Sequence, residues 1–506
     1  MKTAAIYLTS IIILLNLFCQ EKPAMTENPL KDLSPGAVWK HFDNISSIPH
    51  CSGNESAVRE YIMAYAKKQG LATEADDYGN VKVALPASPG KDSVPACIIQ
   101  THIDMVCEKN AEAKHDFSTD PIALVLDSNW LHANGTTLGA DNGVGVACAL
   151  ALIEDTSVAH GPLELLFTVE EEVGLVGAGK LQDGFIGPRT LINLDSEDLG
   201  TITIGCAGGS STLLRMPADK TVAPQHSVAA LLTVSGLKGG HSGIDIHKKR
   251  GNAIKILARI LSALAESDTW QLADIAGGNK NNAIPREARA TLCAADTKAL
   301  DELKNTLNRV IVKIRRNNSD VSVQLEQLDK DSIEVLSPDA RNAVLKALVD
   351  LPHGVLAMSK DIEDLVQTSN NLATVAVRGN SVEIGTMARS SVEKELAEVE
   401  ASIVAVAETV GAVTETSERY PGWEPDVNSR VLAIAQQACE KTLGRPARVE
   451  AIHAGLECGI IGERFPGLDM ISIGPDIRGA HSPDERVDVK SVERFWQFFT
   501  AILQNL

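Results

Sequence analysis

Short apolar runs alternate with helical patterns through the first part of the chain. The run at 94–106 is typical of a buried strand, and residues 143–155 repeat apolar side chains as a helix does. Two further runs, at 163–170 and 190–195, also predict strands. Strands that alternate with helices indicate an α/β domain with a mainly parallel sheet flanked by helices. In such sheets, ligand-binding and active sites lie just beyond the carboxyl ends of the strands.

The pattern changes between residues 209 and 417, where strand-like and helical segments recur in a similar order. The segments are 227–237, 252–266, 287–295 and 300–316 in the first half, and 337–351, 371–391 and 392–410 in the second. Gly379–Asn380 is typical of a two-residue hairpin turn inside the last strand-like segment. The repeated order predicts an inserted α+β domain of two similar halves, each packing helices on one sheet face.

A turn-rich segment, "RYPGWEPD" at 419–426, marks a return to the first domain. It is followed by a helical pattern and a last α/β section. We therefore expect a discontinuous main domain, at 25–208 and 418–506, interrupted by an insert at 209–417. A chain of 506 residues is long enough for these two domains.

Composition narrows the functional classes. The net charge is -19, and no basic stripe is present, which argues against nucleic-acid binding. The nine cysteines are spread singly, without the C-x-x-C pair of a zinc ribbon or thioredoxin-like motif. Most of them lie in apolar surroundings, so we expect reduced core residues rather than disulfides, as in a cytoplasmic enzyme.

The N-terminus favours export instead. Lys2 precedes an apolar stretch, Ala4–Phe18, which is short for a membrane span and typical of a signal segment. Cys19 follows directly and is a candidate for lipid attachment. The alternative is a start at Met25, which would make the protein cytoplasmic. With either start, residues 1–24 are expected to lie outside the fold, and the localisation stays open.

Acidic and imidazole side chains gather where predicted strands end. His102 and Asp104 are two residues apart, so both side chains lie on one face of an extended segment, where a carboxylate can support a metal-bound imidazole. The run Glu170–Glu172 directly follows an apolar strand. Of two adjacent carboxylates, one can bind a metal while the other accepts a proton from water.

Three further candidates are ambiguous when taken alone. Asp141 lies among glycines, where taken alone it favours the role of a helix cap or turn residue, with a carboxylate that bridges two cations as the alternative. Asp195 ends a strand, and His481 lies in a turn-rich loop. Two histidines and three carboxylates without a thiolate suit catalytic zinc or a similar divalent ion. Two ions that share one carboxylate leave room for a bridging water.

A set of motifs occurs along the chain in a specific order. They are "QTHIDMV", "TTLGADNGVGVA", "FTVEEEVGL", "INLDSEDLGTITIGCAGG", "GGHSGIDIHKKRGNA", "NNAIPREA" and "GAHSPDERV". Together they resemble the aminoacyl-histidine dipeptidases, which belong to the dinuclear zinc peptidase superfamily of carnosinases and related carboxypeptidases. The resemblance runs from about residue 33 to the C-terminus. It implies an α/β catalytic domain with an inserted lid, here of the doubled length found in the bacterial dipeptidases.

The resemblance also implies a role for each metal-binding candidate. Asp141 matches the ligand that bridges the two ions. His102 and Asp195 would complete one metal site, and Glu172 and His481 the other.

The remaining roles concern catalysis. Glu171 matches the general base that takes a proton from water and returns it to the leaving amine. Asp104 matches the aspartate that orients His102. His241, in "GGHSG", resembles the lid histidine that steadies the oxyanion of the tetrahedral intermediate.

Three residues are candidates for binding the substrate. Arg389 resembles the arginine that receives the substrate's terminal carboxylate, although a surface ion pair is the alternative. Asn282 is a candidate for the substrate backbone, or a turn residue before Pro285. Glu457 is a candidate for the free amino group.

The sequence thus predicts a two-zinc hydrolase of Xaa-His and related dipeptides, with manganese or cobalt as other possible metals. The alternatives are a tripeptidase or deacylase of the same superfamily, or a non-catalytic binding relative. A homodimer is left open. Lid closure predicts hinges near 205–210 and 415–420.

Overall fold

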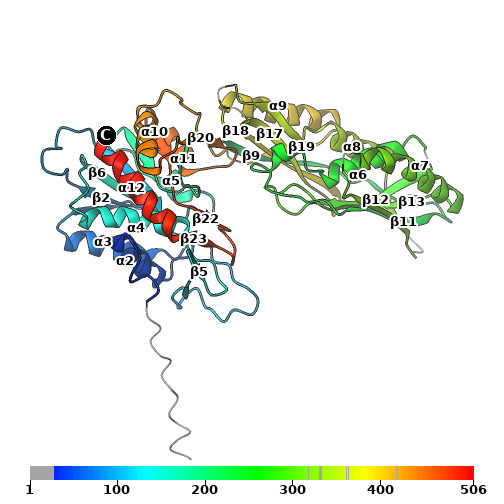
Figure 1. Ribbon diagram of the computed structural model, residues 1–506. Helices are drawn as coiled ribbons and strands as arrows, with labels where there is room; N and C mark the ends of the chain where they lie inside the picture. Colours follow the sequence, from blue (N-terminus) through cyan, green and yellow to red (C-terminus); the bar gives the residue numbers. More distant parts are fainter. Residues whose placement is uncertain are drawn as a thin grey trace, which may run out of the picture.

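The protein has two lobes joined by a narrow connection (Figure 1). The computed structural model describes residues 28–267, 269–316, 318–329, 333–360, 362, 364–417 and 419–506. The signal-like segment and Cys19 lie outside the described residues. Among the helices that are described, none combines the length and apolar character needed to cross a membrane.

A mixed eight-stranded sheet forms the centre of the main domain. Its strands are β1 (Ala72–Ala75), β2 (Val81–Leu85), β3 (Cys97–His102), β6 (Leu163–Thr168), β7 (Thr190–Asn193), β8 (Thr201–Cys206), β20 (Arg448–Ile452) and β21 (Asp469–Ser472). They lie in the order β1-β2-β6-β3-β7-β21-β8-β20. The central strands β6, β3, β7 and β21 run parallel, whereas β1 and β2 are antiparallel to their neighbours. The predicted α/β domain is confirmed.

Helices from both parts of the chain complete the main domain. They are α2 (Gly36–Ser46), α3 (Ser56–Lys68), α4 (Ala140–Glu154), α5 (Val176–Lys180), α10 (Arg430–Leu443), α11 (Glu457–Arg464) and α12 (Val489–Asn505). A small sheet joins β4 (Leu124–Asp127), β5 (Trp130–Ala133), β22 (Ile477–Arg478) and β23 (Arg486–Asp488). One hydrophobic core contains residues on both sides of the insert, from Leu30 to Cys206 and from Trp423 to Leu503.

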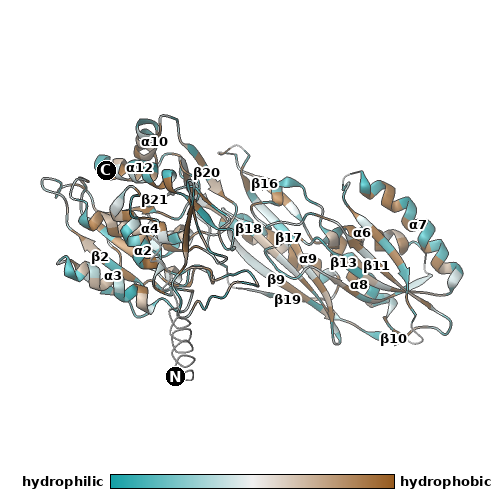
Figure 2. Cartoon of the chain, turned by 60° about the horizontal axis from the view of Figure 1, so that its bottom comes forward, coloured by the Kyte–Doolittle hydropathy of each residue, from teal (hydrophilic) through white to brown (hydrophobic). Residues whose placement is uncertain are grey.

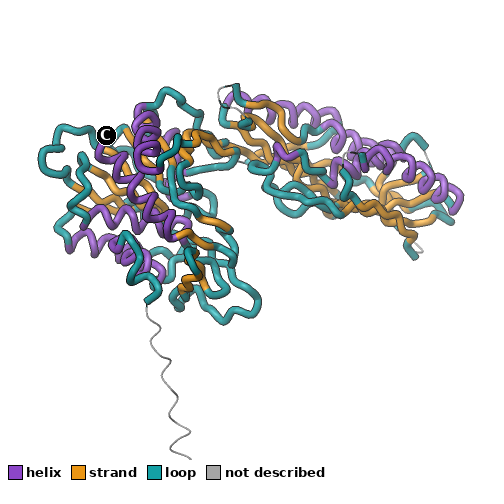
Figure 3. The backbone as a smooth tube through the Cα atoms, viewed as in Figure 1, coloured by secondary structure: helices purple, strands orange, loops and turns teal. Residues whose placement is uncertain are grey.

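The second lobe is a lid built on a nine-stranded sheet. Its strands are β9 (Gly208–Pro217), β11 (Val228–Ser235), β12 (Trp270–Gly277), β13 (Ala288–Ala294), β14 (Ser322–Gln327), β16 (Gly354–Met358), β17 (Val366–Arg378), β18 (Ser381–Ser390) and β19 (Val413–Thr416). Its helices are α6 (Ala253–Leu264), α7 (Thr297–Arg315), α8 (Pro338–Asp350) and α9 (Glu393–Thr409), with a short turn η1 (Ile246–Lys248). The four helices lie along one face of the sheet (Figure 3). The strands β10 (Lys220–Val222) and β15 (Glu334–Leu336) pair separately.

The lid consists of two halves with the same topology, as predicted. The first half has the strand order β14-β11-β13-β12, and the second has the mirrored order β17-β18-β9-β19. The halves join where β12 pairs with β17. The hairpin between β17 and β18 turns at Gly379–Asn380, with Gly379 in the left-handed region at φ 57°.

The helices of the lid are amphipathic, which explains how each covers the sheet. Figure 2 shows α7 with one hydrophobic and one hydrophilic face. Next to Ala299, its buried side chains recur every three or four residues, at Leu300, Leu303, Leu307 and Ile311. This spacing places them on a single stripe that packs against the lid core.

The two chain segments that join the lobes run side by side. Cys206 pairs with Trp423, and Gly209 pairs with Tyr420, in isolated β-bridges. A Cβ atom at Gly208 would lie 2.4 Å from the backbone nitrogen of Gly422, so only glycine allows this close approach. These segments overlap the predicted hinge regions.

One expectation about cysteine is wrong. Cys51 and Cys107 form a disulfide, with their Cα atoms 5.7 Å apart. The two residues are 56 positions apart and lie in different loops, so no local spacing motif reveals the pair. The other cysteines in the described part of the chain are buried and free, as expected: Cys97, Cys148, Cys206, Cys293, Cys439 and Cys458.

Candidate metal centre

The five predicted metal ligands come together at one edge of the main sheet. His102 is the last residue of β3, and Asp195 and Glu172 follow the ends of the neighbouring strands β7 and β6. Asp141 stands at the start of α4, in non-helical conformation. His481 approaches from the loop between β22 and β23. The sheet thus collects at one place residues that are far apart in sequence.

The carboxylate of Asp141 lies between the two histidines. His102 Nε2 is 3.2 Å from Asp141 Oδ1 and 3.2 Å from Asp195 Oδ1. His481 Nε2 is 3.2 Å from Asp141 Oδ2 and 2.9 Å from Glu172 Oε2. Each oxygen of Asp141 therefore faces a different group of one histidine and one further carboxylate. Such an arrangement suits a carboxylate that bridges two cations.

The chemistry of these residues fits two divalent ions. Within each group, the nitrogen and oxygen atoms lie within 4.8 Å of one another. Glu172 Oε1 is buried without a hydrogen-bond partner, as expected of an atom that faces a cation. Burial raises the pKa of Asp195 to about 6, and the neighbouring carboxylates of Asp141 and Glu172 contribute to the rise. Cations would supply the positive charge that this cluster of acids lacks.

Asp104 organises the residues around the site. Its backbone carbonyl lies 3.0 Å from His102 Nδ1, and its carboxylate lies 3.5 Å away. The carboxylate accepts hydrogen bonds from the backbone N–H groups of Glu171 and Glu172, and a third from the Ser52 hydroxyl. Although burial opposes ionisation, His102 and these donors lower the pKa of Asp104 to about 2. One side chain therefore fixes both the His102 imidazole and the backbone of Glu171 and Glu172.

The three consecutive glutamates take different orientations. Glu170 has φ 51° and accepts a hydrogen bond from the Tyr78 hydroxyl at 2.6 Å, away from the metal ligands. Glu172 faces His481. Glu171 lines the same cavity as the ligands, where burial and the nearby carboxylates of Asp195, Glu457 and Glu172 raise its pKa well above its usual range. A raised pKa suits a group that takes up a proton and then returns it.

A cavity of about 640 Å³ lies over the metal ligands. The main domain contributes the side chains of Asp141, Glu172, Asp195 and His481, and the lid contributes Gly243, Ile244, His247 and Val366. His453 of the main domain also lines it and lies 2.7 Å from the hydroxyl of lid residue Ser369. The cavity is therefore formed by both domains.

His241 and Asn282 do not line this cavity. They line a second cavity, of about 830 Å³, on the lid. His241 Nδ1 accepts hydrogen bonds from the backbone N–H groups of Gly243 and Ile244, at 3.2 Å and 3.1 Å. Burial, with the positive charge of Arg389, lowers the pKa of His241 to about 4. The imidazole is therefore neutral at pH 7, and its proton is on Nε2.

The other two substrate-binding candidates are buried. Arg389, on β18, is 4% exposed, which contradicts the alternative of a surface ion pair. Its guanidinium donates to the Tyr420 hydroxyl at 2.6 Å and to Ser242 at 3.4 Å. Glu457 accepts hydrogen bonds from Gln100 and Thr168, while its Oε1 is buried without a partner.

Sequence reasoning missed Glu485. This residue is 2% exposed, and its carboxylate accepts hydrogen bonds from four consecutive backbone N–H groups, at 2.7–3.2 Å. The donors are Leu138, Gly139, Ala140 and Asp141. The only available signal was its position four residues after His481 in a motif that already contained a ligand.

Comparison with known proteins assigns the family. Residues 98–505 match the model of peptidase family M20/M25/M40. The chain belongs to this family. It is also 39% identical over 480 residues, 94% of this chain and 99% of the relative, to the cytosol non-specific dipeptidase of Escherichia coli. It is therefore a peptide hydrolase.

Solved structures of related peptidases agree with this family assignment. The aminoacylhistidine dipeptidase of Vibrio alginolyticus is 38% identical, with a TM-score of 0.88 over 95% of this chain and 98% of that protein. An aminopeptidase of Bacillus cereus shares the fold at 16% identity, with a TM-score of 0.54 over 93% of this chain and 98% of that one. The first match covers both domains, which agrees with a catalytic domain that carries an inserted lid.

Proposed function

We propose that this chain is a dinuclear metallodipeptidase that hydrolyses Xaa-His and related dipeptides, with zinc as its metal. The observation that carries the proposal is the position of Asp141 between His102 and His481, in the cavity that Glu171 also lines. The names of the two relatives above, a non-specific dipeptidase and an aminoacylhistidine dipeptidase, agree with this substrate class. Nitrogen and carboxylate ligands without a thiolate favour catalytic zinc, although manganese and cobalt accept similar ligands.

The metal ligands divide into two sites with one shared residue. His102, Asp141 and Asp195 would hold one ion, and Asp141, Glu172 and His481 would hold the other. When bound, two such ions would lower the pKa of a bound water and polarise the peptide carbonyl. The protein orients these ligands through Asp104 and Glu485, as described above.

Glu171 would move the proton during the reaction. Its carboxylate accepts a proton from the attacking water and later transfers it to the nitrogen of the departing amine. Its neighbours support this role, because burial and nearby negative charge favour the protonated form that must exist between the two transfers. The backbone N–H of Glu171 is fixed by Asp104 at 3.0 Å, so the base has a defined position.

The lid would bind and orient the dipeptide. The neutral His241 presents an Nε2–H donor, suited to an oxyanion that forms at the attacked carbonyl. The buried guanidinium of Arg389 suits the substrate's terminal carboxylate, and Asn282 lies beside His241 to contact the backbone. Because His241 and the metal ligands line different cavities, this role requires the lid to move about its connecting segments. The free Oε1 of Glu457 is a candidate acceptor for the amino group.

Hydrolysis by metal-depleted protein tests the proposal. The panel contains β-alanyl-histidine, other Xaa-His and non-His dipeptides, a tripeptide and an N-acetylated dipeptide, each with and without zinc, manganese or cobalt. We expect metal to restore cleavage of dipeptides, and the panel to give the preference. Cleavage confined to the acetylated or tripeptide substrate would contradict the dipeptidase assignment. Absence of cleavage by protein with two bound ions would contradict catalysis altogether.

A further inference from the structure

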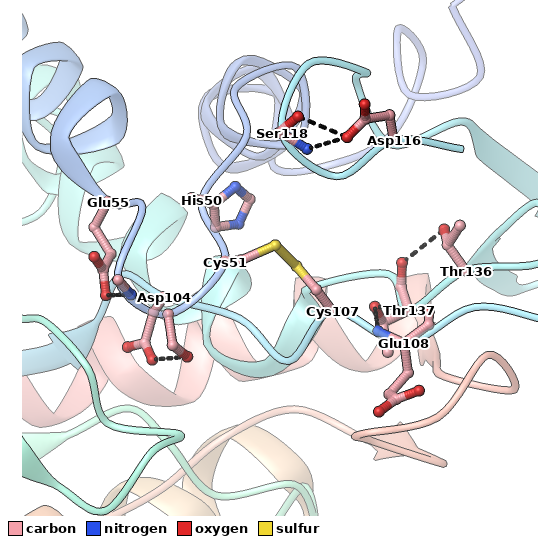
Figure 4. Close-up of a disulfide and its surroundings, with 12 residues drawn as sticks. His50, Cys51, Glu55, Asp104, Cys107, Glu108, Asp116, Ser118, Thr136 and Thr137 are labelled. Carbon is pink, nitrogen blue, oxygen red and sulfur yellow. Dashed lines mark hydrogen bonds between the residues drawn. A yellow bond between two sulfur atoms is a disulfide. The ribbon is translucent and has the colours of Figure 1, made fainter. Parts of the chain in front are cut away.

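The disulfide lies close to the residues that support the metal centre. Figure 4 shows Cys51 and Cys107 between Asp104 on one side and Thr136 and Thr137 on the other. Cys51 belongs to the loop between α2 and α3, and Cys107 belongs to the segment that follows β3. This covalent bond therefore links the loop before α3 directly to the segment that carries Asp104.

On the Cys51 side, backbone and side-chain contacts continue the link. Cys51 forms a parallel bridge with Met105, whose N–H donates to the carbonyl of His50 at 3.1 Å. The next residue, Ser52, donates its hydroxyl hydrogen to Asp104 Oδ2 at 2.7 Å. Thus a residue adjacent to the disulfide provides one of the donors that hold the Asp104 carboxylate.

On the Cys107 side, the contacts lead to the bridging ligand. Glu108 N–H donates to Thr137 Oγ1 at 3.3 Å, and Thr137 N–H donates to the Glu108 carbonyl at 2.9 Å. The residues that follow Thr137 lead directly to Asp141. A Cβ atom at Gly139 would lie 2.9 Å from Met105 Sδ, so these segments are in close contact. The disulfide thus lies among three segments that together support Asp104 and Asp141.

We propose that Cys51 and Cys107 are positioning residues of the metal centre, and that reduction of their disulfide weakens metal binding. A dithiol would supply two electrons and two protons, break the S–S bond to leave two Cys thiols, and itself become a disulfide. With a phosphine, water supplies the two protons and the oxygen of the phosphine oxide that forms. The loop at 51–54 then loses its covalent attachment, so the Ser52 hydroxyl is held less well against Asp104. The carboxylate that fixes His102 loses one of its donors, and metal affinity falls.

The disulfide also relates to the compartment in which the protein works. Structural disulfides persist in oxidising compartments and are rare where thiols are kept reduced. The disulfide therefore favours the exported alternative over the cytoplasmic one, and the proposal predicts weaker metal loading in a reducing cytosol. The proposal rests on the proposed function for its metal centre, but its test measures zinc affinity, which does not require dipeptide cleavage.

The test compares oxidised and reduced holoprotein. Zinc affinity is measured by chelator competition after treatment with a phosphine reductant, with mass spectrometry to verify the thiol state. The same measurements are made on the double variant Cys51→Ser/Cys107→Ser, with and without reductant. We expect reduction to weaken zinc binding about 10-fold to 100-fold, the range seen when groups that orient metal ligands are removed. The double variant should show the weaker affinity throughout and should not respond to reductant.

Two further variants separate positioning from general stability. Ser52→Ala should lower zinc affinity with the disulfide intact, and Ser52→Thr, which keeps the hydroxyl, should restore it. Circular dichroism at the assay temperature identifies any variant that has simply unfolded. Equal zinc affinity in fully reduced and oxidised protein would overturn the inference, as would an equal response of the double variant to reductant. If the oxidised holoprotein cleaves no dipeptide, the proposed function fails, while the affinity comparison still decides the role of the disulfide.

Discussion

Glu485 holds the backbone of Asp141. Its Oε1 accepts a hydrogen bond from the Asp141 N–H at 3.2 Å, although the two residues are 344 positions apart in the chain. The side chain of Asp141 faces both histidines, so a carboxylate from one end of the chain positions the ligand that the two metal groups share. Because Glu485 follows His481 by four residues, one loop both supplies a ligand and orients another.

This relationship predicts that Glu485→Gln weakens metal binding. Glutamine has the same shape, but its amide carries one acceptor oxygen and an NH₂ donor that would face backbone N–H groups. We expect zinc affinity to fall about 10-fold to 100-fold, as for other groups that orient metal ligands. Chelator competition measures the effect, with the exposed Glu493→Gln on α12 as the matched control. Unchanged affinity in folded Glu485→Gln would show that the four hydrogen bonds do not control the site.

The environment of His241 predicts its protonation state. Because its pKa is lowered to about 4, the native imidazole stays neutral at pH 6, whereas a histidine free in water titrates near 6.5. Between these values the unfolded chain takes up a proton that the native protein does not, so this residue lowers native stability as the pH falls through that window. Nitrogen-15 NMR of the labelled imidazole should show the Nε2–H tautomer at pH 6. A doubly protonated ring at that pH would refute this description.

Arg389 is predicted to control KM through the substrate carboxylate. In Arg389→Lys the charge remains, but the planar fork that binds a carboxylate through two hydrogen bonds is lost. We expect KM for a dipeptide to rise about 10-fold, with a smaller change in kcat, in line with the 1.5–3 kcal/mol of a charged hydrogen bond. Cleavage of the corresponding dipeptide amide should change little. Arg215→Lys, an exposed change on the neighbouring strand β9, is the control. Equal losses for dipeptide and amide would place Arg389 away from the carboxylate.

Residues whose role depends on local position could be predicted from the sequence. His102 and Asp195 stand at the ends of apolar strands, and parallel strands bring such ends to one edge. The two halves of the lid were also predictable, because the order of their elements repeats along the chain. Both features depend on the order of segments along the chain, which can be identified without knowing which segments meet in space.

Contacts between distant segments could not be predicted in this way. Cys51 and Cys107 look like any other isolated cysteines until the fold brings their loops together. Similarly, Asp484 and Glu485 are adjacent acids in one turn, yet Asp484 is exposed and Glu485 is buried. The pairing of β12 with β17, which joins the lid halves into one sheet, is also non-local. Each depends on a partner that no local pattern identifies.

The most direct test of the account is Glu171→Gln, assayed with metal content measured on the same sample. Glutamine keeps the size of the side chain but cannot accept the proton from water. We predict two bound ions per chain, nearly unchanged KM, and a kcat for dipeptides about 100-fold to 10,000-fold lower, the range for a lost general base. A fully metal-loaded Glu171→Gln protein that retains wild-type kcat would contradict the proposed mechanism.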